Sequence, residues 1–262
     1  MRSTLRHQPS TDVTRLDAIL QKLERTYGRP PWSPNHDPLG ELIATILSQN
    51  TSDVNSDRAY AALRAAYPTW EEVVRARLDD LANVIRSGGL ATLKSRRIQE
   101  ILHTVNTRHG YLSLDFLMDI PMPAARAFLA AFRGVGPKTI ACVLLFACGH
   151  PAFPVDTHIY RVTTRLGLLP AGCTAERAHA VLEPHIPPAN VYSAHVHLIR
   201  HGRTICKARQ PDCEHCCLRA LCPYPQHAAK TPVAGREASS SGKAGASDRL
   251  EAGGKKSPTR GM

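Results

Sequence analysis

One short segment, Gly134-Val-Gly-Pro-Lys138, combines a flexible turn with a basic side chain. Glycines let the backbone approach a ligand closely, and Pro137 suits the first position of a helix, where its missing N–H is not needed. The free N–H groups at a helix start face an anion, so such a turn can cradle a phosphate. A turn of this kind is also a common tight connection between helices, and the segment alone leaves both interpretations open.

Lys138 follows this turn directly, in the first turn of the expected helix. At that position the positive end of the helix dipole and any burial both favour the neutral amine. A neutral amine is a nucleophile that forms imines, whereas a free lysine with a pKa of about 10.4 is almost entirely charged at pH 7. The alternative is a solvated lysine that only binds phosphate.

A carboxylate lies eighteen residues further on, in Pro154-Val-Asp-Thr-His158. An aspartate after such a loop often caps the next helix, because its oxygen accepts a backbone N–H. A carboxylate can also accept a proton or stabilise a positive charge in a reaction. Taken alone, Asp156 is more simply interpreted as an N-cap.

Five of the eight cysteines are crowded between Cys206 and Cys222. This crowding favours a metal site in a reducing compartment over a disulfide framework. Zinc loops usually supply two separated short pairs of ligands, and only Cys213 and Cys216 form such a pair. Spacing alone leaves zinc and an iron–sulfur cluster open, with Cys217 as a spare thiol. The other cysteines are expected to be packed thiols: Cys142, Cys148 and Cys173.

Three histidines share one expected helix at positions i, i+2 and i+6, namely His195, His197 and His201. This spacing does not place all three on one face of the helix. We therefore expect surface or core histidines here and no metal site.

The 262 residues include 33 Lys and Arg against 22 Asp and Glu, a formal net charge of +11. This balance favours a polyanionic partner, with nucleic acid ahead of an anionic membrane. Hydrophobic residues make up 43% of the chain, which excludes a largely disordered or fibrous protein. No apolar run approaches the ~18 residues of a membrane-spanning helix. The stretch from Met1 to Thr11 has no apolar segment of the secretory kind, and we expect a short solvated arm.

Apolar residues recur at helical spacing along the chain, and nothing alternates with period two for long. Thr69 and Glu72 form a capping-box pattern that opens one helix. The sequence therefore predicts an all-α fold. Helices are expected around Leu16–Leu23, Leu39–Leu47, Leu78–Ile85, Arg97–Val105, Ala124–Phe132, Lys138–Cys148 and Val191–Gly202, whereas Leu166–Pro188 contains several turn residues.

Three motifs occur here in an order typical of one family: Gly134-Val-Gly-Pro-Lys138-Thr, Val155-Asp-Thr-His158 and Cys206-x6-Cys213-x2-Cys216-x5-Cys222. On these motifs the chain resembles the endonuclease III family of DNA glycosylases. The similarity extends from about Leu16 to Tyr224 and includes Leu42–Gln49 and Gly89-Leu90.

The resemblance implies a two-domain helical fold with a helix-hairpin-helix motif and a C-terminal iron–sulfur cluster loop. One domain would be discontinuous and carry the loop, comprising residues 13–39 and 151–226. The other, residues 40–150, would carry the hairpin. Residues 1–12 would be a flexible arm. Residues 227–262 are rich in Gly, Ser, Ala, Lys and Arg, a composition typical of a disordered basic tail.

The resemblance also implies an activity: excision of damaged bases, oxidised pyrimidines in particular, from duplex DNA, followed by β-elimination at the abasic site. Lys138 matches the nucleophile of the family, and Asp156 matches its catalytic carboxylate. A [4Fe-4S] cluster would be held by Cys206, Cys213, Cys216 and Cys222. The enzyme would be a monomer that does not bind a membrane. It would lie in the cytoplasm and, in a bacterium, be associated with the nucleoid.

DNA contacts follow from the same resemblance. Leu90 falls where the family inserts a wedge into the base stack, and Asn50 falls where a glutamine fills the space of the extruded nucleotide. An enzyme that cuts a glycosidic bond must extrude the nucleotide, and a wedge with a polar plug offsets part of the unstacking cost. Basic residues of the cysteine loop would contact the DNA backbone. The expected contacts are Gly134, Gly136, Gln49, Asn50, Leu90, His158, Lys207 and Arg209.

The sequence departs from the family at two places. Phe132-Arg133 stands where Leu-Pro is usual, and Gln49-Asn50 stands where Ala-Gln is usual. A mismatch-specific uracil or thymine glycosylase is therefore an alternative. A non-catalytic DNA-binding or redox-sensing module is another, although the presence of both Lys138 and Asp156 counts against it.

Overall fold

The computed structural model describes residues 13–225, which form helices and connecting segments and contain no strand. The all-α prediction is therefore confirmed, whereas the expected arm and tail lie outside the described residues. The α-helices are α1 Val13–Tyr27, α2 Pro38–Ser48, α3 Asp53–Ala66, α4 Trp70–Arg75, α5 Leu78–Val84, α6 Ala91–His109, α7 Met122–Ala130, α8 Pro137–Cys142, α9 Thr157–Arg165, α10 Ala175–Leu182 and α11 Val191–Thr204.

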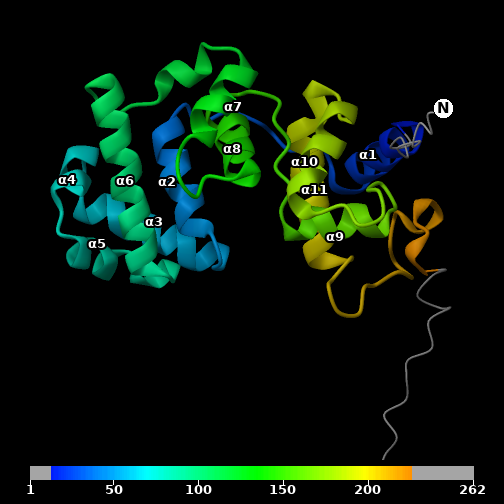
Figure 1. Ribbon diagram of the computed structural model, residues 1–262. Coiled ribbons are helices and arrows are strands. Elements are labelled where there is room, and N and C mark those ends of the chain that lie inside the picture. Colours follow the sequence, from blue (N-terminus) through cyan, green and yellow to red (C-terminus); the bar gives the residue numbers. More distant parts are fainter. Residues whose placement is uncertain (1–12, 226–262) are drawn as a thin grey trace, which may run out of the picture.

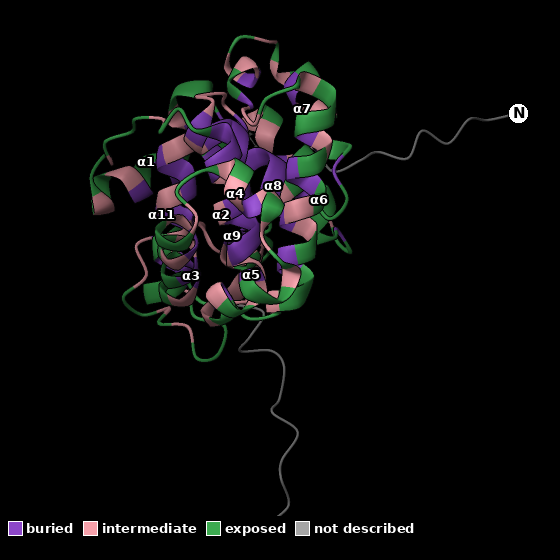
Figure 2. Cartoon of the chain, turned by 90° about the vertical axis from the view of Figure 1, so that its left-hand side faces the viewer, coloured by how far each residue is buried: buried purple, intermediate pink, exposed green. Residues whose placement is uncertain are grey.

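Helices α2 to α8 gather on one side of the molecule, and α1 joins α9, α10 and α11 on the other (Figure 1). We call the first group the hairpin lobe. The second group, with the cysteine-containing loop that follows α11, is the cysteine lobe. Each lobe has its own buried hydrophobic cluster, and purple buried residues occupy the inner faces of the helices in Figure 2. The exact domain limits remain a prediction.

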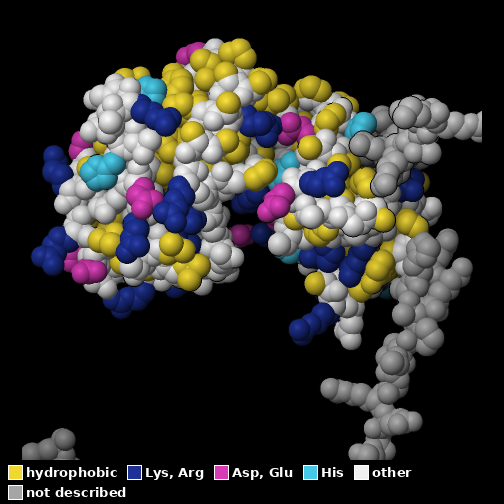
Figure 3. Space-filling view, viewed as in Figure 1, with side chains coloured by type: hydrophobic (Ala, Val, Ile, Leu, Met, Phe, Trp, Pro, Cys, Tyr) yellow, Lys and Arg dark blue, Asp and Glu magenta, His cyan; other side chains and the backbone are white. Residues whose placement is uncertain are grey.

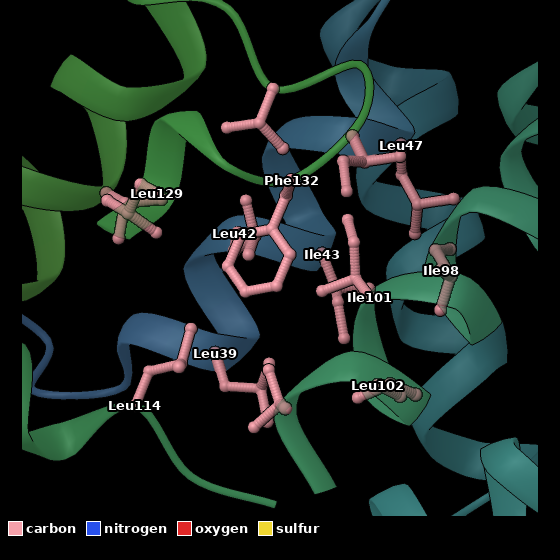
Figure 4. Packing of buried hydrophobic residues seen from close by; sticks show 14 of the residues in the cluster. Leu39, Leu42, Ile43, Leu47, Ile98, Ile101, Leu102, Leu114, Leu129 and Phe132 are labelled. Atoms are coloured by element: carbon pink, nitrogen blue, oxygen red, sulfur yellow. The ribbon is translucent and has the colours of Figure 1, made fainter. Parts of the chain in front are cut away.

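The hairpin lobe is built around α2, whose start follows local capping rules. Pro38 occupies the first turn, and the side chain of Asp37 accepts the N–H of Gly40 at 2.8 Å. Leucines and isoleucines of α2 then pack against α6 and against the start of the hairpin (Figure 4). Phe132 is buried there and meets the ring of Phe128 edge-on, with centroids 5.4 Å apart. The unusual residue at position 132 therefore still fills a core site.

One predicted helix start agrees with the structure and another does not. Thr69 and Glu72 form the expected capping box at the start of α4. Helix α6 begins at Ala91, earlier than the apolar pattern from Arg97 indicated, because polar and basic residues occupy its first turns. The chain stops α6 with Gly110 at φ +77°, a left-handed conformation that suits glycine.

The helix expected over Lys138–Cys148 changes character halfway. Residues Pro137–Cys142 form α8, and Val143–Ala147 continue as a π-helix, closed by a 3.1 Å bond from the N–H of Cys148 to the carbonyl of Val143. Such segments are often found at functional sites. Helix α10 lies inside Leu166–Pro188, where turn residues had obscured the helical pattern, and Thr174 caps it.

The isolated thiols and the three histidines of α11 pack as expected. Cys142 and Cys173 are buried, and Cys148 is half-buried against the hairpin-lobe core. All three histidines are buried, even though their spacing spreads them around the helix. Within residues 13–225, no helix has the length and apolar composition needed to cross a membrane.

Candidate active site between the two lobes

The Gly134–Lys138 turn has the geometry that its sequence indicates. Gly134 has φ +78°, and a Cβ at this position would collide with the guanidinium of Arg97. Gly136 is extended and serves as the N-cap of α8, with Pro137 in the first turn. Nothing lies within 4 Å of a Cβ placed at Gly136, so the helix start faces open space. An anion can therefore approach the backbone here.

Lys138 and Asp156 line the same cleft, although they belong to different lobes. Lys138 lies in the first turn of α8, in the hairpin lobe, and Asp156 begins α9, in the cysteine lobe. The cleft measures about 530 Å³, and the surface is hollowed between the two lobes in Figure 3. The fold thus brings together the two residues that sequence analysis singled out for catalysis.

Asp156 is the N-cap of α9, as its local sequence predicts. Its Oδ1 accepts the N–H of Ile159 at 2.7 Å, which fixes the carboxyl group at the helix start. The second oxygen is left for the cleft that Asp156 lines. An N-cap and a catalytic carboxylate are therefore compatible roles for one side chain.

An uncharged wall stands beside this pair, formed by Cys142, Phe146, His195, Val196 and Ile199. Burial raises the pKa of the Cys142 thiol to about 11, against the opposing effect of the nearby Lys138. Burial lowers the pKa of His195 to about 4, so its ring is neutral at pH 7. The wall is suited to a flat, largely apolar group placed against it.

The cleft also has a charged part of its lining. Arg203, near the end of α11, donates to Asp53, at the start of α3, across a 2.6 Å ion pair that joins the two lobes. Arg200 also lines the cleft, with its guanidinium 4.7 Å from the centre of the Tyr27 ring. The lining of the cleft therefore combines Lys138 and Asp156 with uncharged side chains and two arginines.

The expected DNA-contacting residues of the hairpin lobe are placed outside this cleft. Gln49 is held within the protein: its Oε1 accepts from Arg97 at 2.8 Å, and its Nε2 donates to Thr139 at 3.3 Å. With Gly134 and Gly136 it lines a second hollow, which Lys138 also reaches. Asn50 and Leu90 are exposed and have φ values of 55° and 49°. A left-handed backbone is unusual for a leucine, and it leaves this side chain 55% exposed.

Sequence analysis missed the structural role of Lys94. Its Nζ donates to the carbonyls of Leu47 and Gly88, both at 2.7 Å, and the side chain is only 2% exposed. Burial lowers its pKa, with the nearby Arg97 as a second cause. Lys94 thus ties the end of α2, next to Gln49-Asn50, to the turn that presents Leu90.

The four cysteines expected to bind a cluster line one cavity, above Leu166 and Leu218. Arg165 donates to the Cys206 sulfur at 3.3 Å, and the Sγ of Cys216 lies 3.5 Å from Nε2 of His201. Burial and neighbouring thiols raise the pKa of Cys216 to about 11. Neighbouring sulfurs disfavour each other's ionisation because two thiolates repel. A bound cationic centre would offset this repulsion, so the four thiols form a suitable donor set for one. Within the described residues, no group of three or more His, Cys, Asp or Glu side chains is placed to hold one metal ion.

The remaining expected contacts lie beside this loop. His158 is half-buried on α9, with Nδ1 at 3.1 Å from Arg161. Lys207 and Arg209 are exposed. Arg165 holds the loop backbone by donating to the carbonyls of Lys207 and Ala208 at 2.7 and 3.0 Å. These residues form a basic edge on the cysteine lobe, separate from the cleft.

Comparison with protein families identifies this architecture. Residues 43–188 match the model of the HhH-GPD superfamily of base excision DNA repair proteins, over more than half of the chain. The chain belongs to this superfamily. The matched region runs from α2 through the hairpin to the turn after α10 and contains both Lys138 and Asp156. The prediction of a base-excision-repair DNA glycosylase is therefore confirmed.

Individual relatives agree with this assignment. The chain is 33% identical over 185 residues to endonuclease III of Sulfolobus acidocaldarius, covering 70% of this chain and 80% of that enzyme. It is 38% identical over 165 residues to an Arabidopsis thaliana protein provisionally named a DNA glycosylase. That match covers 63% of this chain and 56% of the plant protein's length.

Solved structures show the same fold. A non-covalent endonuclease III–DNA complex superposes with a TM-score of 0.71 at 28% identity, covering 84% of this chain and 99% of that one. A trapped covalent endonuclease III–DNA intermediate gives a TM-score of 0.70 at 28% identity, covering 83% and 99%. The similarity to endonuclease III thus extends over both lobes.

Proposed function

We propose that this protein excises damaged bases from duplex DNA and then cleaves the abasic strand, with Lys138 as the nucleophile. The observation that carries the proposal is the shared cleft: Lys138 from one lobe and Asp156 from the other line a single opening about 530 Å³ in volume. An amine and a carboxylate that line one opening can act together on one sugar.

The chemistry follows from these two groups. Asp156 stabilises positive charge on the sugar as the glycosidic bond breaks and the base leaves with the bonding electrons. The Lys138 nitrogen forms a bond to C1′ and gives one of its protons to the departing base. The bond from C1′ to the ring oxygen then breaks, the ring oxygen takes the second nitrogen proton, and an imine remains between Lys138 and C1′. Removal of a C2′ proton then expels the 3′ phosphate by β-elimination. Asp156 is the nearby group able to move these protons, since it lines the same cleft.

The substrate class we propose is an oxidised pyrimidine in duplex DNA. The uncharged wall formed by Phe146, Val196 and Ile199 suits the flat face of an extruded base. The exposed Leu90 and Asn50 are placed on the hairpin lobe as candidates for the wedge and plug that hold the duplex open. The names of the relatives agree with DNA as the partner.

We further propose that Cys206, Cys213, Cys216 and Cys222 hold a [4Fe-4S] cluster in this enzyme, which acts as a monomer. The four side chains line one cavity, and four thiolates are the ligand set that such a cluster takes. The same cavity is lined by apolar residues such as Leu166 and Leu218 and by one carboxylate, that of Asp212. When bound, the cluster would join these four cysteines to one another and so cross-link the loop. Arg165 and the cysteines would then hold Lys207 and Arg209 toward the DNA backbone.

Borohydride trapping tests the proposed activity. With duplexes that carry a single oxidised pyrimidine, the native protein should form a covalent complex after reduction, because an imine is reducible. Lys138→Ala should abolish trapping and strand cleavage while DNA binding persists. Asp156→Asn should slow excision, since the amide still caps α9 and cannot accept a proton.

Other outcomes would change the proposal. Excision without any strand cleavage by the native protein would favour a monofunctional glycosylase and remove the nucleophilic role of Lys138. A trapped peptide that maps to another lysine, such as Lys94 or Lys207, would contradict the assignment. A panel of duplexes with single oxidised, uracil and thymine-mismatch lesions would show whether oxidised pyrimidines are preferred.

A further inference from the structure

The two lobes are connected through residues 149–156, a non-helical segment between the π-helix and α9 that we call the strap. Asp156 is its last residue. Ala152, Phe153 and Val155 are buried, with exposures of 0%, 0% and 4%. A buried segment outside helices and sheets must find other partners for its backbone N–H and carbonyl groups.

Three side chains of the cysteine lobe supply these partners. The N–H of Phe153 donates to Oε2 of Glu183 at 2.8 Å. The carbonyl of Phe153 accepts from Nδ1 of His179 at 3.1 Å, and the carbonyl of Pro154 accepts from Nδ1 of His195 at 3.0 Å. Each bond comes from α10, from the turn that follows it, or from α11.

The same cluster reaches the hairpin lobe. Nη2 of Arg126, on α7, donates to both carboxylate oxygens of Glu183, at 2.8 and 3.0 Å. Glu183 therefore joins an arginine of one lobe to the backbone that leads into Asp156 in the other. Its carboxylate and the Arg126 side chain are both largely shielded from solvent, so the link is more constrained than an exposed pair.

We infer that His195, with His179 and the Arg126–Glu183 pair, is a positioning group that sets where Asp156 lies relative to Lys138. The inference rests on the proposed function, in which these two residues act on one sugar. C-terminal to Asp156, the cap bond to Ile159 holds its side chain. N-terminal to it, His195 fixes the strap at Pro154, two residues earlier.

The state of the two histidines agrees with this role. Burial lowers the pKa of His179 and His195, so both rings are neutral at pH 7. A neutral ring carries one N–H, and a carbonyl partner requires that proton to lie on Nδ1. His195 therefore adds no charge beside Lys138, although it lines the same cleft, and its effect on catalysis would pass through the backbone.

His197 provides a matched control on the same helix. It is also buried, 3% exposed against 5% for His195, and its Nε2 donates to a carbonyl, that of Gly28, at 2.7 Å. Gly28 follows α1 and lies outside the strap. Replacing either histidine by leucine removes one hydrogen bond to a carbonyl, a buried bond for His195 and a part-buried one for His197, and only His195→Leu frees the strap.

The experiment measures single-turnover excision and, separately, affinity for duplex containing an abasic-site analogue. His195→Leu should slow excision by roughly 10- to 100-fold at unchanged affinity, because a small misplacement of a catalytic group costs up to about 100-fold. His197→Leu should stay within about twofold of the native rate. His195→Asn should recover most of the loss, because its amide N–H can replace Nδ1–H.

Equal rates for His195→Leu and His197→Leu would overturn the inference, as would an Asn variant no faster than the Leu variant. If His195→Leu does not fold, His179→Leu applies the same test at the neighbouring carbonyl. Asp156→Asn, measured alongside, separates the two claims. A fully active Asp156→Asn variant would contradict the proposed function itself. An impaired Asp156→Asn variant together with an unimpaired His195→Leu variant would contradict only the positioning role.

Discussion

The two lobes hold their functional residues by different means. In the hairpin lobe, Lys138 projects from a regular helix start that is backed by a continuous apolar cluster. In the cysteine lobe, Asp156 lies at the end of the strap, and the cysteines lie in the loop after α11. In both segments, long-range hydrogen bonds from side chains fix the backbone. A helix satisfies its own backbone groups, whereas a loop depends on particular distant side chains.

This difference has a consequence for sensitivity to mutation. Apolar packing tolerates exchanges of similar volume, and the phenylalanine at position 132 is one example. A buried carbonyl that loses its donor has no such substitute. Single polar replacements should therefore damage the cysteine lobe more than the hairpin lobe, with Lys94 as an exception to be tested.

The largest effect is expected in the cysteine loop. Cys213→Ser should remove one of four ligands, lower the iron content from about four per chain, and loosen the loop by several kcal/mol. Iron analysis and limited proteolysis of the loop measure both effects. Cys173→Ser, which replaces a packed thiol outside the loop, is the control and should keep its iron. Stoichiometric zinc in place of iron in the native protein would contradict the cluster.

Lys94→Met should cost about 3 kcal/mol of unfolding free energy. The substitution keeps most of the side-chain volume and leaves the carbonyls of Leu47 and Gly88 without their donor, at roughly 1–3 kcal/mol each. Urea denaturation measures the change, with Lys22→Met on the exposed face of α1 as control. A loss below about 1 kcal/mol would show that the hairpin lobe tolerates polar replacements even at this site.

The buried histidines of the cysteine lobe should make the unfolding free energy depend on pH. The folded pKa of His195 is about 4 and that of His179 is also lowered, whereas an unfolded histidine titrates near 6.5. Below about pH 6.5 the unfolded chain therefore binds protons that the folded chain excludes. The unfolding free energy should fall between pH 6.5 and 4, by up to about 3 kcal/mol from His195.

Urea midpoints measured across this range test the histidine contribution. His195→Asn removes one titrating ring and should reduce the slope of the pH profile over the same interval, while His179 and His201, whose pKa values burial also lowers, keep the remainder. A profile unchanged by this substitution would assign the acid sensitivity to other groups.

The smallest effect is expected at the ion pair between Asp53 and Arg203. Both side chains are about half exposed or more, at 63% and 47%, and exposed pairs contribute about 1 kcal/mol or less. Asp53→Asn should therefore shift the unfolding free energy by less than about 1 kcal/mol, and added salt should reduce even this. A larger loss would mean that this exposed ion pair contributes more to holding the two lobes together than its exposure indicates.

Local rules account for what could be predicted from the sequence. Pro137 in the first turn of α8, the capping box at Thr69 and the N-cap at Asp156 each depend on residues a few positions apart. The resemblance then selected Lys138 and Asp156, and the fold places both on one cleft. Only the resemblance, with its domains of residues 40–150 and of residues 13–39 and 151–226, assigned the two residues to different domains, because no local pattern around either residue does so.

The rest depended on contacts that no local pattern records. Lys94 lies in the polar run Thr-Leu-Lys-Ser-Arg-Arg and looks like a solvated lysine, yet one of its partners is 47 residues away. His179 and Glu183 reach the strap across 26 and 30 residues. Burial of a polar side chain is decided by such distant partners, so periodicity cannot reveal it.

The order in which these lobes can form during synthesis follows from the path of the chain. The hairpin lobe is contiguous, and its hydrophobic cluster is complete once the ribosome has passed Ala152. Helix α1 is made first, and its apolar face of Leu16, Ile19 and Leu23 belongs to the other cluster, with partners in α11. The partners of that face in α11 are synthesised only in the final quarter of the described chain. The nascent protein therefore carries an unpaired hydrophobic helix through most of translation, and α1 is the segment on which a chaperone that binds apolar helices would act.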